Sequence, residues 1–528
     1  MKSLMKKVFA AAAAIATVFG LAATTVATAN AADNATLTVS TTDAKFAGKT
    51  VNAYKMFSAT VSGDGKAVSY TLTDEWKPFF KNSVGLTGVT DENVNDKAND
   101  YVSKLKDSTL VAFATKASNW AQTKANNITA DATATVSADA SNGKYTATFT
   151  GLGYGYYVVA VPGATLANAK SQYATLVSVH STKVDADIKG DLPTVDKKVQ
   201  VDGTGKDATD AKIGDTLTFT LTSTIPDMSA YDTYTFNFKD TLSKGLTFGQ
   251  VKSVKVENVT LTENTDYTVT TPTASNNNTL TVAMKDFKTK QQANAGKKIT
   301  VTYTATLNEN AVVGGAGNVN SAKIQYSNNP STNGTGESEP SKVRVFTYGF
   351  TVDKYTGDQY TDAATRLAGA EFTLAHKDGS AISFVQVSAG SATANAVYRV
   401  AKAGETGTTT ITTPANGKVV FEGLENGEYT LTETKAPAGY NKLASAIGVK
   451  VDGQNNGTDT TNATVTITYN NDNGNDYNQT ASNGVIPVQN KSGAILPGTG
   501  GMGTIAFTVI GVLVIALGVA WTLKRKNA

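Results

Sequence analysis

Apolar and polar residues alternate with a period of two over much of the chain. In residues 215–222, DTLTFTLT, three apolar side chains fall on one face and the threonines between them on the other. Residues 297–307, KKITVTYTATL, repeat the pattern, with apolar positions at Ile299, Val301, Tyr303, Ala305 and Leu307. Such alternation predicts strands with one buried face. Because Gly, Asn and Asp separate many of these stretches, we expect β-sandwich domains.

One segment departs from this pattern. From Asp96 to Lys124 the apolar residues follow a helical spacing, at Tyr101, Val102, Leu105, Leu110, Val111, Phe113, Ala114, Ala117, Trp120 and Ala121. We therefore expect one or two helices inserted into the first domain.

Polar connectors divide the chain. Residues 187–198 (DIKGDLPTVDKK) are polar with one proline, and residues 327–342 (SNNPSTNGTGESEPSK) have the composition of a loop or linker. A third connector, 491–495 (KSGAI), follows the last strand pattern. The chain is thus predicted to be mainly β, with three tandem immunoglobulin-like sandwich domains at 32–190, 191–343 and 344–490.

The N-terminus has the composition of a secretory signal peptide. Three lysines among the first seven residues precede an apolar stretch, which ends in the small residues Ala29-Asn30-Ala31. This order predicts cleavage after Ala31, so that residues 1–31 are removed. The domains that follow are then expected outside the cell.

The C-terminal segment 491–528 contains a second apolar stretch. Residues 505–523 carry no charge and are followed at once by Lys524, Arg525 and Lys526. A helix of this length would just cross a hydrocarbon core, and the basic tail would remain in the cytoplasm. The stretch predicts a transmembrane helix.

Composition excludes several classes of function. The formal charge is +3, but six basic residues and no acidic ones lie in the signal peptide and after Thr499, which leaves −3 between them. No basic stripe remains for nucleic acid. The chain has no cysteine and only two histidines, His180 and His376, which are far apart in sequence. We expect no disulfide, no metal, no cofactor and no enzymatic turnover.

A pentapeptide stands just before the C-terminal apolar stretch. Leu496-Pro497-Gly498-Thr499-Gly500, the apolar stretch and the basic tail together resemble the LPxTG sorting signal of Gram-positive bacteria. The resemblance implies that a sortase cleaves between Thr499 and Gly500. Its cysteine would hold the Thr499 carbonyl as a thioester until an amine attacks.

Two further motifs resemble Gram-positive pilins with CNA-type domains. Residues 429–440, YTLTETKAPAGY, are similar to the pilin E-box, and the VDK at 352–354 and VIPVQN at 485–490 are similar to the first and last strands of such a domain. The resemblance implies an amide between Lys354 and Asn490, with Glu433 as the acid that promotes it. Burial would favour a neutral amine and a protonated acid, which this self-reaction requires.

The middle domain carries a similar set of motifs. By resemblance, PTVDKKVQ supplies Lys197, FKDTLSKGLTF supplies Asp240, and GNVNSAKIQYSNNP supplies Asn320. Lys198 remains open because adjacent residues of a strand face opposite ways and only one can be buried. Asn318 also remains open because it shares the strand parity of Asn320.

The first domain contains a weak repeat of the E-box region. GLGYGYYVVAVPG starts at Gly151 and GLENGEYTLTETKAPAGY at Gly423, and their alignment places Val161 where Glu433 stands. Without an acid at that position, we expect no amide in the first domain.

These features together resemble a major pilin, the shaft subunit of a fimbria that supports adhesion and colonisation. The resemblance implies that Lys189, on the first connector, attacks the Thr499 thioester of another subunit, although the usual Tyr-Pro before the lysine is replaced by Asp187-Ile188. The implied partners are identical subunits, pilus-specific and housekeeping sortases, minor tip and base pilins, and peptidoglycan. The alternative is a monomeric wall-anchored adhesin that binds a host surface ligand.

Overall fold

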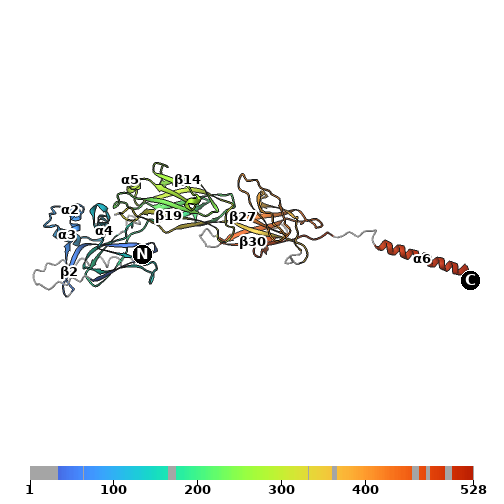
Figure 1. Ribbon diagram of the computed structural model, residues 1–528, viewed down its shortest axis with the longest axis horizontal. Coiled ribbons are helices and arrows are strands. Elements are labelled where there is room, and N and C mark those ends of the chain that lie inside the picture. Colours follow the sequence, from blue (N-terminus) through green and yellow to red (C-terminus); the bar gives the residue numbers. More distant parts are fainter. Residues whose placement is uncertain are drawn as a thin grey trace.

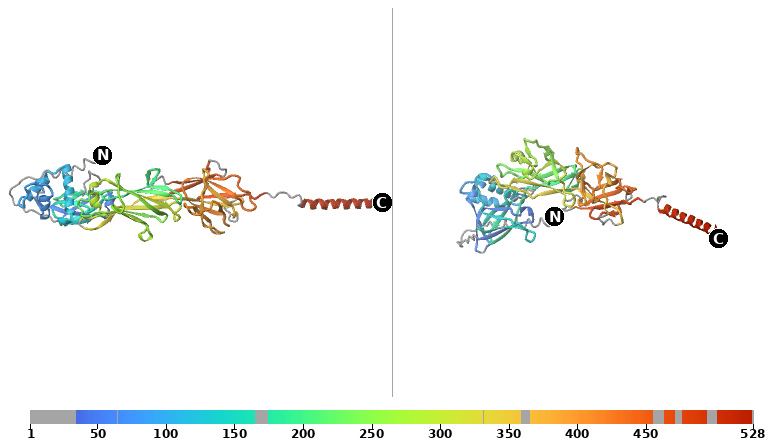
Figure 2. Two further views of the ribbon diagram at one scale, coloured as in Figure 1. Left: turned by 90° about the horizontal axis from the view of Figure 1, so that it is seen from above. Right: turned by 45° about the vertical axis from the view of Figure 1, so that its right-hand side comes forward.

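The computed structural model describes residues 34–63, 65–164, 174–330, 332–358, 365–454, 463–470, 476–493 and 502–526. The predicted mainly β fold is confirmed. Figure 1 shows three strand-rich groups that follow one another along the long axis in the order of the sequence, and the views in Figure 2 agree. The signal peptide and the LPGTG pentapeptide lie outside the described residues.

The first group contains two sheets and a helical layer. One sheet has the order β5-β1-β8, and the other has the order β3-β2-β6-β7 with β4 paired to β2. The strands are β1 Ala35–Thr41, β2 Thr50–Val61, β3 Val68–Leu72, β4 Ala132–Thr135, β5 Tyr145–Leu152, β6 Gly155–Ala160, β7 Ala174–Val179 and β8 Lys183–Asp187.

Three helices cover the second of these sheets. They are α2 Lys77–Asn82, α3 Val94–Ser103 and α4 Asp107–Gln122. Their apolar faces, including Phe79 and Phe113, pack with Phe57 and Tyr156 of the sheet in one buried cluster. One or two helices were expected between Asp96 and Lys124, and two, α3 and α4, are present. Helix α2 was not anticipated because six residues are too few for a helical period to be recognised in the sequence.

The middle group is a two-sheet sandwich. Its sheets have the orders β10-β9-β12-β18-β14-β15 and β11-β21-β19-β13-β17-β16, with β20 paired to β19. The elements are β9 Asp196–Val201, β10 Thr204–Lys206, β11 Ala208–Asp210, β12 Thr216–Thr224, β13 Phe236–Leu242, β14 Leu246–Val256, β15 Val259–Thr260, β16 Tyr267–Thr270, β17 Thr279–Met284, α5 Phe287–Gln291, β18 Lys298–Leu307, β19 Asn318–Ser327, β20 Thr335–Glu337 and β21 Ser341–Phe346.

The two stretches with the clearest alternation form the centre of this sandwich. Strands β12 and β18 pair antiparallel over their full length, with Phe219 opposite Tyr303. Both of these side chains are fully buried, and their rings stack with centroids 5.3 Å apart. Threonines occupy the other face, where Thr216 and Thr306 share a hydrogen bond of 2.9 Å between their hydroxyls. The period-two pattern is therefore realised as predicted.

The third group also has two sheets. Their orders are β24-β25-β27-β22-β32 and β26-β23-β28-β29-β30-β31. The strands are β22 Tyr348–Tyr355, β23 Glu371–His376, β24 Phe384–Ser388, β25 Ala396–Val400, β26 Ile411–Thr412, β27 Lys418–Leu424, β28 Gly427–Lys435, β29 Ile447–Gln454, β30 Thr464–Asn470, β31 Gln479–Thr480 and β32 Val485–Gln489.

First and last strands lie side by side in the outer groups. Strand β1 pairs parallel with β8, and β22 pairs parallel with β32. In the middle group, the backbone N–H of Lys197 on β9 donates to the Ser341 hydroxyl on β21 at 3.0 Å. The beginning and the end of each group are therefore neighbours in space.

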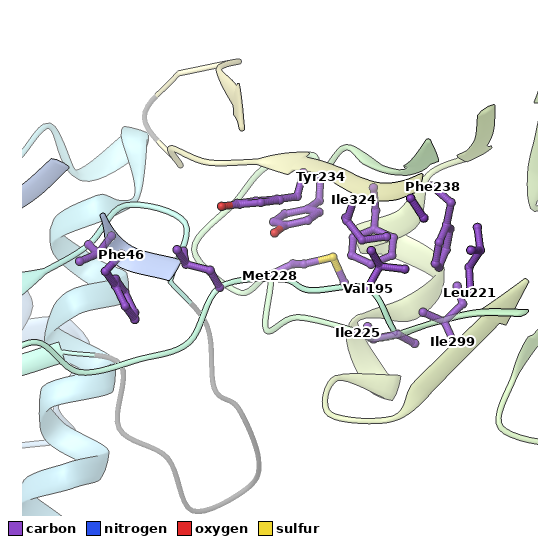
Figure 3. Close-up of a cluster of buried hydrophobic side chains, with 14 of the residues drawn as sticks. Phe46, Val195, Leu221, Ile225, Met228, Tyr234, Phe238, Ile299 and Ile324 are labelled. Atoms are coloured by element: carbon purple, nitrogen blue, oxygen red, sulfur yellow. The ribbon is translucent and has the colours of Figure 1, made fainter. Parts of the chain in front are cut away.

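One buried apolar cluster continues from the first group into the middle one. Figure 3 shows part of it, with Phe46 beside the first group and Val195, Leu221 and Ile324 inside the middle sandwich. The middle and third groups are joined by apolar and polar contacts. Ala208 and Ile213 of the middle group pack in the buried apolar cluster of the third. Asn426 donates its backbone N–H to the Asp210 carboxylate at 2.6 Å.

A single helix, α6 Met502–Lys526, forms over the C-terminal apolar stretch. Within the part of the chain that the structure describes, no helix is long and apolar enough to cross a membrane, and the predicted transmembrane span is not supported.

Candidate functional site

Lys197 lies at the centre of the middle sandwich. Its position on β9 turns the side chain between the sheets, where none of its surface is exposed. The amine forms an ion pair with the carboxylate of Asp240 on β13, which is 1% exposed. Asn320 on β19 is fully buried beside them. The three residues expected from the sequence are therefore brought together in one apolar core.

A fourth residue, Tyr303 on β18, connects these three. Its hydroxyl accepts from Lys197 Nζ at 2.8 Å and from Asn320 Nδ2 at 2.6 Å, and it donates to Asp240 Oδ2 at 2.5 Å. In the sequence, Tyr303 stands only as one of the alternating apolar positions of its strand. The signal in the sequence that could have indicated its contact with the cluster is a tyrosine at the middle of a buried face, since a buried phenol usually requires a hydrogen-bond partner.

Lys198 and Asn318, the alternatives to Lys197 and Asn320, occupy different environments in the structure. Lys198 faces outward, where its amine contacts the Asp207 carboxylate at 2.5 Å and its side chain is 31% exposed. Asn318 is buried, but its amide is occupied by the backbone: it accepts from Val312 N at 2.9 Å and donates to Val345 O at 3.1 Å. Lys197 therefore pairs with Asp240, and Asn320 contacts the same Tyr303 hydroxyl as these two residues do.

The third group contains a second cluster of the same residue types. Lys354 on β22 is fully buried, 3.4 Å from Glu433 Oε1 on β28. Asn490, which follows β32, donates to Glu433 Oε2 at 3.0 Å. The backbone completes the cluster, because Leu443 N donates to Glu433 Oε2 at 2.7 Å and Lys354 donates to Val488 O at 3.2 Å.

Burial controls the protonation of both lysines. It lowers the pKa of Lys197 to about 8 despite the opposing effect of Asp240, and it lowers the pKa of Lys354 to about 8 despite Glu433. Burial, together with the neighbouring Asp240 carboxylate, raises the pKa of Tyr303 well above its ordinary value. Each amine is therefore closer to its neutral, nucleophilic form than an exposed lysine is.

Within the described part of the chain, each of the two clusters contains two buried oxygens that accept no hydrogen bond, one on the acid and one on the asparagine. Among the described residues, no group hydrogen-bonds to Asp240 Oδ1 or Asn320 Oδ1, and the same holds for Glu433 Oε1 and Asn490 Oδ1. An unpaired buried polar atom costs about 1–3 kcal/mol. If the acid is protonated, its free oxygen can donate to the free carbonyl oxygen of the asparagine. That hydrogen bond would polarise the carbonyl towards attack by the neighbouring amine.

The first group has the same local framework without the acid. Tyr157 donates its hydroxyl to Gly153 O at 2.6 Å, and the aligned Tyr429 donates to Glu425 O at 2.7 Å. The repeat seen in the sequence is thus a repeated structural element. Val161, aligned with Glu433, packs in the apolar cluster and is 2% exposed.

The residues expected to join subunits are placed only in part. Lys189 lies on the connector between β8 and β9, with its amine 3.4 Å from Asp187 Oδ2 and its side chain 31% exposed. Thr499 and the rest of the pentapeptide lie outside the described residues.

Comparisons with known proteins relate two segments to pilin families. Residues 213–330 match the family model of the Gram-positive pilin backbone subunit 2, Cna-B-like domain. Residues 358–466 match the SpaA model, a prealbumin-like fold domain. These segments lie in the middle and third groups, which contain the two clusters.

Individual relatives agree with these matches. The trypsin-resistant surface T6 protein of Streptococcus pyogenes serotype M6 is 26% identical over 279 residues, which cover 48% of this chain and 44% of that protein. The alignment thus spans less than half of the relative's length.

Solved structures are similar at lower identity. The T6 backbone pilin of Streptococcus pyogenes is 18% identical with a TM-score of 0.46, over 87% of this chain and 99% of that one. The major pilin SpaD of Corynebacterium diphtheriae is 20% identical with a TM-score of 0.40, over 88% and 98%. The chain is therefore similar to Gram-positive pilin backbone subunits over residues 213–330 and to the SpaA prealbumin-like fold domain over residues 358–466.

Proposed function

We propose that the protein is a shaft subunit of a covalent surface polymer and that two internal amides, Lys197–Asn320 and Lys354–Asn490, strengthen it. The observation that carries this proposal is the matched geometry of the two clusters. In each cluster, a buried lysine on the first strand of the domain forms an ion pair with a buried acid. A buried asparagine from near the end of the same domain completes the cluster. In each cluster, one buried oxygen of the acid and the asparagine carbonyl oxygen accept no hydrogen bond among the described residues, which leaves both available to the reaction.

The proposed reaction is a transamidation within the chain. Proton transfer from the lysine ammonium to the carboxylate gives a neutral amine and a protonated acid. The acid then donates its proton to the asparagine carbonyl oxygen while the amine attacks the carbonyl carbon. A new C–N bond forms, the bond to Nδ2 breaks, and ammonia leaves with a proton that the amine gives up. The acid recovers its proton from the hydroxyl when the carbonyl re-forms, so no cofactor is needed. The reaction occurs once because the amine and the carboxamide are consumed.

The arrangement of the terminal strands supports a mechanical role. Strand β22 lies beside β32 in a parallel pair, and Asn490 follows β32 directly. An amide between Lys354 and Asn490 would connect the two ends of the domain covalently. Tension along a polymer would then load a covalent link before it loaded the hydrogen bonds of the sheet. Such links would take the place of the disulfides that the chain, with no cysteine, cannot form.

We further propose that subunits are joined by a sortase through the Thr499 carbonyl and Lys189. The LPGTG pentapeptide and the partly exposed amine of Lys189 support this. Joining two different surfaces head to tail does not close on itself and makes a filament. Sortases, minor pilins and peptidoglycan are the partners that such a filament on the cell wall would require.

The test of the internal amides is the intact mass of denatured residues 32–495. We expect a mass below the sequence value by two ammonia molecules, with fragments that locate both links. Glu433→Gln serves as the matched control, because it keeps the size of the side chain and removes the acid. It should reduce the loss to one ammonia molecule. An unmodified mass for the parent chain would refute the amides.

A further inference from the structure

The two clusters differ in how the acid and the amine are held. In the C-terminal domain, backbone groups contact them: Leu443 N binds Glu433, and Val488 O accepts from Lys354. In the middle domain, the hydroxyl of Tyr303 occupies the centre and contacts lysine, acid and asparagine. The middle cluster therefore contains a titratable group that the reaction described above does not use.

The position of this hydroxyl is determined by packing. Tyr303 is fully buried, and its ring stacks on Phe219 with an interplanar angle of 17°. The same two rings lie near the amine, with Lys197 Nζ 5.1 Å from the centroid of Tyr303 and 5.2 Å from that of Phe219. The stacking holds the hydroxyl in one place, so its three contacts do not depend on a mobile side chain.

The hydrogen bonds of the hydroxyl form a continuous path for protons. A hydroxyl can accept two hydrogen bonds and donate one. Here it accepts from Lys197 Nζ and from Asn320 Nδ2, and it donates to Asp240 Oδ2. The group that must lose a proton, the group that must gain one and the nitrogen that must leave as ammonia all contact a single oxygen.

We propose that Tyr303 is a catalytic proton relay for the amide between Lys197 and Asn320, an inference that rests on the proposed function. In the first step the phenol gives its proton to Asp240 and receives one from the Lys197 ammonium. After attack, it gives a proton to the departing Asn320 nitrogen and receives one from the new amide nitrogen. Asp240 lends its proton to the carbonyl oxygen during attack and recovers it when the carbonyl re-forms. At the end the phenol is unchanged, Asp240 is protonated and one ammonia molecule has left. In the middle domain the lysine and the acid are thus contacted by a tyrosine side chain, whereas in the C-terminal domain they are contacted by backbone groups.

The experiment compares the formation of the two amides in the same molecule. Residues 32–495 carrying Tyr303→Phe are expressed briefly at low temperature, and the linked peptides Lys197–Asn320 and Lys354–Asn490 are quantified by mass spectrometry over time. The phenylalanine keeps the ring that stacks on Phe219. We expect formation of the first link to slow on the order of 100-fold, as for the loss of a general acid–base group. The second link should form at the parent rate.

Tyr231→Phe is the matched control. Tyr231 is another buried tyrosine of the middle domain, and its hydroxyl donates to Ser327 O at 3.2 Å, away from the cluster. This variant should form both links at the parent rate. Should Tyr303→Phe not fold, a fluorinated tyrosine at position 303 keeps the shape and changes only the acidity of the phenol, and the rate of the first link should change with it.

The outcomes separate the relay from the proposed function. Formation of the first link at the parent rate in Tyr303→Phe, or an unchanged rate with the fluorinated tyrosine, would overturn the relay and leave the amides in place. Absence of the Lys197–Asn320 link in the parent chain itself would overturn the proposed function for this domain, and the relay with it.

Discussion

Lys354 lies opposite Val488 on the parallel first and last strands of the C-terminal domain, and its amine donates to the Val488 carbonyl oxygen at 3.2 Å. Asn490 follows two residues later and contacts the same acid, Glu433, as the lysine. The amine therefore approaches the place where the domain ends. A link at this point would join the ends of the domain directly, which is what resistance to pulling requires.

Replacement of Lys197 by alanine should change both the mass and the stability of the chain, whereas replacement of its neighbour Lys198 should change neither by much. Lys197→Ala should abolish one ammonia loss and lower the free energy of unfolding by about 2–4 kcal/mol, as the loss of a covalent cross-link does. Lys198→Ala should keep the mass of the parent and change stability by less than about 0.5 kcal/mol, because its amine pairs with Asp207 at the surface. Intact mass and urea unfolding measure both. Loss of the link in Lys198→Ala instead would reverse the assignment.

The two buried asparagines of β19 should be separable by mass and stability. Asn320→Ala should lose the link. Asn318→Ala should keep it but destabilise the domain by about 1–3 kcal/mol, since Val312 and Val345 would lose their buried hydrogen-bond partner. Mass spectrometry and thermal unfolding of the two variants test this. A link still formed in Asn320→Ala would show that another residue supplies the carbonyl.

The stability of an unlinked C-terminal domain should depend on pH through Lys354. In Asn490→Ala the amine stays free, and burial lowers its pKa from the ordinary 10.5 to about 8. Between these values the unfolded chain binds more protons than the folded chain, so the free energy of unfolding rises with pH. The rise contributed by Lys354 should be at most about 1.4 kcal/mol per pH unit.

The control for this measurement is Asn490→Ala/Lys354→Met, which lacks the titrating amine. Urea unfolding of both variants from about pH 8 to about pH 9.5 isolates the contribution of Lys354, because all other groups are shared. If the free energy of unfolding changed with pH in the same way for both variants, the pKa of Lys354 would not be lowered in the folded domain.

Lys189 should be needed for polymers. In cells that express the matching sortase, the parent chain should give a ladder of high-molecular-weight species on denaturing gels, and Lys189→Ala should give only monomer. Lys183→Ala, at the start of the preceding strand, is the matched control and should keep the ladder. A ladder from Lys189→Ala would assign the attacking amine to another lysine. No ladder from the parent chain would favour the monomeric adhesin.

The class of fold could be predicted from the pattern of apolar and polar residues, and so could the residue types of the two proposed amide clusters. Alternation in residues 215–222 and 297–307 requires a strand because only a period of two places every apolar side chain on one face. The pairing of β12 with β18 follows that pattern along both strands. The residue types of the clusters were also recognisable, since a lysine, an acid and an asparagine occur in matching order in two domains.

Which individual residues contact one another could not be predicted from the sequence, because it depends on how the two sheets of each sandwich pack. Strand parity shows that Lys197 and Lys198 face opposite ways, but not which face is covered by the second sheet. Asn318 and Asn320 share a face, and they differ only in whether backbone groups occupy the amide. Tyr303 resembled any other apolar position of its strand. The proton relay proposed for Tyr303 depends on its hydroxyl contacting three side chains from three other strands. Contacts between segments that are distant in sequence are set by packing and not by the local pattern.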